Sequence, residues 1–176
     1  MTSPNFLRYA GWAAILGAVA SLLNVISGIL WLMFTFSPFF GGLSDMFSVL
    51  SLALMIPVAL ALHLLLRPRA PVLSLVAAAI GILSMLVYGI LQALLVAGVL
   101  TYQQVSLPNI TASAGVGIWL LLANYAALRS EVLPRGLAWA GLITGAGFLV
   151  LVLGFLIYPV WAIWLSRWLL RSRSPQ

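Results

Sequence analysis

His63 is the only histidine in this chain of 176 residues, and its imidazole is the side chain best suited to proton transfer or cofactor binding. It lies one helical turn before Arg67. Asn124 and Tyr125 stand about as far before Arg129, so antiparallel helices would bring all three groups to one level. We therefore expect an inner polar cluster of His63, Asn124 and Tyr125, which either joins helices by hydrogen bonds or contacts a ligand.

A second set of polar side chains follows the helical period in other apolar segments. Ser84, Tyr88 and Gln92 recur every four residues, and Asn24 lies near the middle of the first apolar segment. Thr144 adds a weaker polar group in the fifth apolar segment. These residues predict either a polar cleft that holds a ligand or a dry seam between helices, because membrane helices place small and weakly polar residues at their contacts.

Most enzymatic chemistry is not supported by the residue types present. The chain has no cysteine and no lysine, and its two acids, Asp45 and Glu131, stand in segments that we expect to form turns. No metalloprotease, serine hydrolase or nucleotide-binding motif occurs. We therefore expect no enzymatic activity, no metal site and no bound cofactor, with His63 as the one ionisable candidate inside the bilayer.

The composition places the chain in a membrane. Hydrophobic residues make up 64% of the sequence and charged residues 6%, with a mean hydropathy of +1.20. An ordinary soluble domain has roughly a quarter of its residues charged. The sequence therefore predicts a single integral membrane domain over residues 1–176, whose main partner is the lipid bilayer.

The apolar segments predict an all-α, polytopic bundle of transmembrane helices. The expected spans are about 9–36, 46–66, 72–100, 113–128, 137–154 and 157–171. Residues 37–45, which contain Pro38 and two glycines, read as a break after which Ser44 or Asp45 caps the second span. Residues 101–111 are polar and uncharged, which suits a loop on the opposite face.

The last segment, from Gly136 to Arg171, is too long for one straight span. A reversal near Tyr158–Pro159 gives six spans, with both termini cytoplasmic and every arginine on one side. Without the reversal, five spans result and a tryptophan-rich C-terminal helix lies along the outer interface. The positive-inside rule favours six spans.

All eight basic residues are arginines, and the net charge is +6. Because no basic face alternates with exposed aromatic residues, this charge indicates topology and not nucleic-acid binding. We expect a multi-pass protein of a bacterial inner membrane. Its expected interfacial anchors are Arg8, Trp12, Arg67, Arg69, Arg129, Arg135, Trp139 and Arg171.

Gly141 and Gly145 form a G-x-x-x-G pair, which allows two helix backbones to approach closely. In a chain with 15 glycines such a pair favours packing within the chain over a specific dimer.

The stretch LPRGLAWAGLITG at residues 133–145, followed by YPVWAIWL at 158–165 and a basic end, resembles a broad group of uncharacterised bacterial small polytopic membrane proteins, of the domain-of-unknown-function kind. The opening stretch from Arg8 to Trp12 is similar in style. This resemblance implies a membrane protein and brings no activity, cofactor or site residue with it.

Together these features predict an integral membrane protein with an accessory, scaffolding or binding role, whose further partners would be other membrane proteins or a second copy of the chain. A small transporter or carrier of a lipophilic ligand, using the polar cleft, is the alternative. A haem- or pigment-binding membrane subunit is a second alternative, and it predicts visible absorbance in the purified protein.

Overall fold

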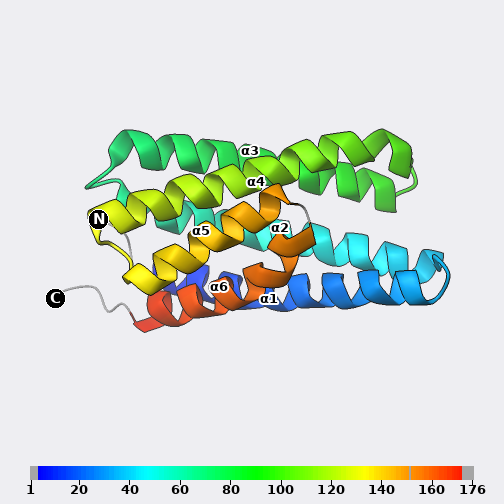
Figure 1. The fold of residues 1–176 in the computed structure, drawn as a ribbon, viewed down its shortest axis with the longest axis horizontal. Coiled ribbons are helices and arrows are strands. Elements are labelled where there is room, and N and C mark those ends of the chain that lie inside the picture. The colour runs from blue at the N-terminus through cyan, green and yellow to red at the C-terminus, as the bar shows by residue number, and fades with distance from the viewer. Residues whose placement is uncertain (1–3, 151, 172–176) are drawn as a thin grey trace.

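The chain forms six α-helices in the computed structural model, which describes residues 4–150 and 152–171 (Figure 1). Consecutive helices lie side by side and run in opposite directions. The helices are α1 (Pro4–Met33), α2 (Pro38–Leu66), α3 (Pro71–Val96), α4 (Tyr102–Ser130), α5 (Arg135–Leu149) and α6 (Val152–Arg171). The predicted all-α helix bundle is therefore confirmed.

Four of these helices, α1 to α4, are long and apolar enough to cross a bilayer. Each has 26 to 30 residues, which corresponds to roughly 39 to 45 Å at 1.5 Å per residue. A hydrocarbon core is about 30 Å thick, so each of the four can span it with turns to spare. The chain is a multi-pass membrane protein by this criterion.

The last two helices form a hairpin that extends only part of the way along the bundle (Figure 1). α5 has 15 residues, or about 22 Å, and the chain reverses between Leu149 and Val152. The reversal predicted near Tyr158–Pro159 is therefore misplaced, because both residues lie inside α6. Nor does α6 lie along a surface, since it packs between α1 and α5 and buries Trp161.

Pro159 is tolerated inside α6 because another helix satisfies the carbonyl that it leaves free. Proline has no backbone N–H, so the carbonyl oxygen of Phe155, four residues earlier, loses its usual helical donor. The hydroxyl of Ser21 on α1 donates to this oxygen over 3.2 Å. A proline that marks a turn in a soluble sequence can thus stay within a helix in a membrane bundle.

The polar segments at 37–45 and 101–111 are helical from their second residue onward, contrary to our expectation. α2 begins at Pro38 and not near residue 46, and neither Ser44 nor Asp45 caps it. At Gly41 a side chain would crowd the Trp31 ring, because a β-carbon there would lie 3.2 Å from it. α4 begins at Tyr102, where Thr101 and Gln104 form a capping box, and not near residue 113.

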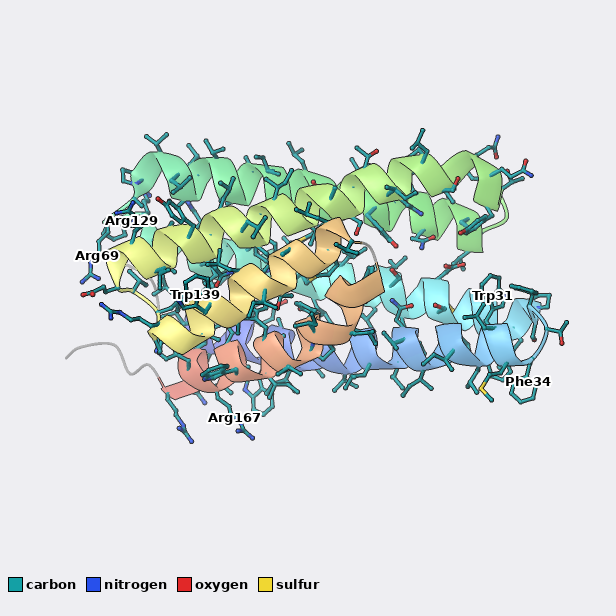
Figure 2. The ribbon with its side chains drawn as sticks, viewed as in Figure 1. Trp31, Phe34, Arg69, Arg129, Trp139 and Arg167 are labelled. Carbon is teal, nitrogen blue, oxygen red and sulfur yellow. The ribbon has the colours of Figure 1, made fainter. Side chains whose placement is uncertain are left out.

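The arginines of the described segments gather at one end of the bundle, hereafter the basic end (Figure 2). A guanidinium nitrogen of Arg69, in the turn after α2, donates to the carbonyl of Ser130 at the end of α4, so the two basic turns touch. Trp31 and Phe34 lie at the opposite, far end. Arg173 lies outside the described residues.

In the basic half, α5 and α6 close the row α1–α2–α3–α4 into a ring, since α5 packs on α4 and α6 packs on α1. The contact of α4 with α5 depends on the predicted glycine pair: a methyl group on Gly145 would lie 2.9 Å from the carbonyl oxygen of Gly117. Intramolecular packing by this pair is confirmed. The far half contains α1 to α4 alone.

Candidate functional site

Asp45 lies inside a membrane-spanning helix, seven residues after the start of α2. If the helix is centred on a 30 Å hydrocarbon core, Asp45 lies roughly 4 Å inside the far boundary of that core. Our expectation that both acids stand in turns is therefore wrong for Asp45. It holds for Glu131, which ends α4 and pairs with Arg135 at 3.3 Å.

Three polar side chains lie near the Asp45 carboxyl group, and we call the four residues the Asp45 cluster. Its members are Asp45 and Ser48 on α2 with Tyr88 and Gln92 on α3. The Gln92 amide lies beside the Asp45 carboxyl group. Tyr88 lies close to Ser48 and Gln92 and within electrostatic reach of Asp45. The four residues bring oxygen atoms from two helices together around a single acid.

Two oxygen atoms of the Asp45 cluster are buried without completing a hydrogen bond. Ser48 is 2% exposed and Gln92 is 7% exposed. Within the described part of the chain, neither Ser48 Oγ nor Gln92 Oε1 has a partner in hydrogen-bonding geometry. Seven other buried side-chain atoms of the described residues also lack a partner, so what distinguishes this pair is its position beside a half-buried acid inside a spanning helix.

A second polar contact adjoins the cluster on the side of α1. Ser44, next to Asp45 in the chain, donates its hydroxyl to Asn24 Oδ1 over 2.7 Å. On the opposite side, the Tyr88 ring lies 6.4 Å from that of Phe155, near the tip of the α5–α6 hairpin. The Asp45 cluster therefore lies between the hairpin tip and the far end of the bundle, and α1, α2 and α3 surround it.

The five residues predicted to form a polar cleft thus lie in three different surroundings. Asn24, Tyr88 and Gln92 all contact the N-terminal part of α2. Ser84 faces α4, where its side chain occupies the space that a β-carbon on Gly115 would need. Thr144 is buried and donates its hydroxyl to the carbonyl of Ala140 in its own helix.

The three residues of the predicted inner polar cluster face different neighbours. Asn124 is buried against α5, where its side chain fills the space above Gly141. Tyr125 is 46% exposed and stacks with Arg129, whose Nε donates to its hydroxyl. His63 lies half-buried in the last turn of α2, and its Nδ1 has no hydrogen-bond partner in the described segments.

Asp45 and Ser48 are the site residues that our sequence reasoning missed. A signal was present, because Ser44, Ser48 and Ser51 recur at spacings of four and three residues, as on one helix face. Because prolines and glycines favour turns, the proline and glycines in the preceding stretch predicted a break in the helix, and these serines were not recognised as part of a helix face.

The Asp45 cluster offers oxygen ligands and a single carboxylate. In the described residues, no three histidine, cysteine, aspartate or glutamate side chains gather as a metal site would require. Hard oxygen ligands with one negative charge suit a monovalent cation or a protonated amine.

No protein family, curated protein or solved structure matches this chain. The class of protein therefore comes from the fold: a multi-pass helical membrane protein with four candidate spans and a short hairpin.

Proposed function

We propose that this protein is a binding component of the membrane that takes a small monovalent cation at the Asp45 cluster. The observation that supports it best is Asp45 itself, an acid inside a spanning helix beside buried, unpartnered oxygen atoms. Acidic residues inside transmembrane segments are costly, and they usually mark ion or substrate sites.

The ligand class follows from charge and ligand type. Ionised Asp45 contributes one negative charge, and the neutral oxygen atoms of Ser48, Tyr88 and Gln92 can complete the coordination of a cation without adding charge. A monovalent cation such as Na⁺ balances this charge. The guanidinium groups of the described arginines lie at the basic end and do not neutralise the site.

Binding is favoured over passage through the bundle by the packing of the basic half. Between the cluster and the basic end, the ring of six helices contains buried aromatic side chains, and the Tyr158 ring contacts those of both Phe148 and Trp161. A carrier would have to move the α5–α6 hairpin to open a route through this half. The far end is therefore the direction from which we expect the cation to enter.

The test compares thermal unfolding of the purified, full-length protein in sodium chloride and in choline chloride at equal ionic strength. Ligand binding to the folded state raises the unfolding temperature. We expect sodium to stabilise the wild-type protein and Asp45→Asn to abolish the difference. Glu131→Gln removes the other acid, which is exposed at the basic end, and should keep the full sodium effect.

Equal unfolding temperatures in the two salts would contradict sodium binding. Methylammonium chloride then tests the second ligand type, a protonated amine. The proposal fails if neither cation stabilises the wild-type protein more than Asp45→Asn.

A further inference from the structure

We propose that the C-terminal part of α6 carries a binding site for the headgroup of an anionic phospholipid. Trp164, Arg167, Trp168 and Arg171 line one concave groove on this helix. They follow one another at spacings of three, one and three residues, so two guanidinium groups and two indole rings share one side of α6. This site is separate from the Asp45 cluster, which lies toward the far end.

The two arginines of the groove differ from most others at the basic end in having no described partner. Arg69 donates to Ser130, Arg129 to the Tyr125 hydroxyl, and Arg135 to Glu131. For Arg167 and Arg171, no ion pair or hydrogen bond to another described residue occurs. Arg167 extends away from the helix bundle in Figure 2. Two uncompensated positive charges one turn apart therefore face outward.

The wall of the groove is held in place by packing against two other helices. The Trp164 ring lies over Gly136 at the start of α5, 3.1 Å from where a β-carbon would stand. Leu169 and Leu170 pack on Gly11 of α1. Because α6 packs on both sides, the fold sets the positions from which the two arginine side chains extend.

The level of the groove relative to the bilayer and the chemistry of its side chains identify its occupant. It lies at the basic end, where the long helices leave the hydrocarbon core and lipid phosphates are found. Guanidinium groups form paired hydrogen bonds to phosphate oxygens, and indole rings prefer the headgroup level. Phosphatidylglycerol offers such a phosphate and a net negative charge, whereas the choline group of phosphatidylcholine cancels that charge. The groove therefore selects anionic over zwitterionic lipid.

Native mass spectrometry of the full-length protein in mild detergent tests this site. Dioleoyl phosphatidylglycerol and dioleoyl phosphatidylcholine are titrated in turn, and retained lipid is counted. We expect the wild-type protein to retain the glycerol lipid preferentially. The double variant Arg167→Gln/Arg171→Gln should lower this retention by about ten-fold, because both phosphate ligands are removed.

The matched control is Arg8→Gln/Arg67→Gln, which removes the same charge from the same end. It should retain the anionic lipid to within about two-fold of the wild-type protein if the groove, and not general charge, is responsible. Circular dichroism establishes that both variants are folded. Arg167→Lys/Arg171→Lys keeps the charges and should restore part of the retention, even if the glutamine variant is unstable.

Three results would overturn the proposal. Retention by the glutamine variant could equal that of the wild-type protein. The control variant could lose as much lipid as the groove variant, which would indicate general electrostatic attraction. Finally, inorganic phosphate at equal concentration could displace the lipid, which would indicate a soluble anion as the natural occupant.

Discussion

In the basic half of the bundle, α5 and α6 close a ring of six helices, whereas the far half consists of α1 to α4 alone (Figure 1). Burial follows this division. On α1, most buried residues lie between Leu7 and Ser21, and from Leu22 to Met33 only Ser27 is buried. The hairpin therefore buries the basic half of α1 and leaves most of its far half exposed, and the one acid inside a spanning helix, Asp45, lies in the half that the hairpin does not cover.

The two halves also use small residues differently. In the basic half, glycines allow direct contact, since Gly117 and Gly145 bring α4 and α5 together backbone to backbone. In the far half, Gly42 and Gly89 have no atom within 4 Å of where a β-carbon would stand. The closest backbone-to-backbone approach at these glycines therefore lies where the hairpin packs on α4, whereas Gly41 in the far half faces a side chain, the Trp31 ring.

The largest expected effect is a difference in chemical labelling between the basic end and the far end, which should lie on opposite sides of the membrane. Because the chain has no native cysteine, single cysteines report sidedness without interference. Arg67→Cys and Arg135→Cys should react with a membrane-impermeant maleimide from the same side, and Val99→Cys only from the other side. Labelling of the Arg67 and Arg135 positions from opposite sides would disprove the two-ended arrangement.

The second prediction tests the tight packing of the basic half. Gly141→Ala would place a methyl group inside the Asn124 side chain and should lower the free energy of unfolding by about 2 to 3 kcal/mol. Gly89→Ala is the matched far-half control, where open space and better helix propensity predict no loss and a gain of up to about 1 kcal/mol. Reversible unfolding in detergent measures both. Similar values for the two variants would remove the contrast between the halves.

A third, smaller effect is expected where the halves meet, at the bond between Ser21 and Phe155. Ser21→Ala should cost about 1 kcal/mol, because it leaves the freed carbonyl unpartnered. In a Pro159→Ala background, alanine restores the missing backbone donor, so the same change at Ser21 should cost much less. A double-mutant cycle gives the coupling. Zero coupling would show that the Ser21 hydroxyl does not compensate for the proline.

The smallest stability effect is expected in the far half. Leucines in place of both Asn24 and Gln92 remove polar groups from a membrane interior, which should leave the free energy of unfolding within about 1 kcal/mol of wild type. The sodium-dependent stabilisation should nevertheless disappear. If sodium still stabilises this variant, Gln92 is not a ligand. If the variant fails to fold, these side chains form a structural seam.

The sequence could predict which turns lie on the same side of the membrane and that the chain reverses after its fifth helix. Both features depend on where arginines and apolar segments stand along the chain. Arg67 and Arg135 mark turns on one side, as the contact between Arg69 and Ser130 confirms. The return of the chain after the fifth helix follows from the arginines in its last segment. The G-x-x-x-G pair also predicted its packing within the chain, since two helix backbones can approach closely only where side chains are absent.

Helix boundaries near polar residues were decided by the tertiary structure. Pro38 and Pro159 suggested turns, yet α2 begins at the first and α6 continues through the second. Proline is accepted at the first position of a helix, and inside α6 its cost is offset by a hydroxyl from α1. The sequence shows the proline but not the distant serine that compensates for it.

The sequence by itself determined that this protein resides in a bilayer, with its basic turns on one side, because solvent preference and charge are sums over residues. Only the tertiary structure decided that the hairpin is short, that Asp45 faces Gln92, and that Tyr125 points outward while Asn124 points inward. The reason is that lipid and protein interior are equally apolar, so hydrophobic patterning does not show which face of a membrane helix meets its neighbours.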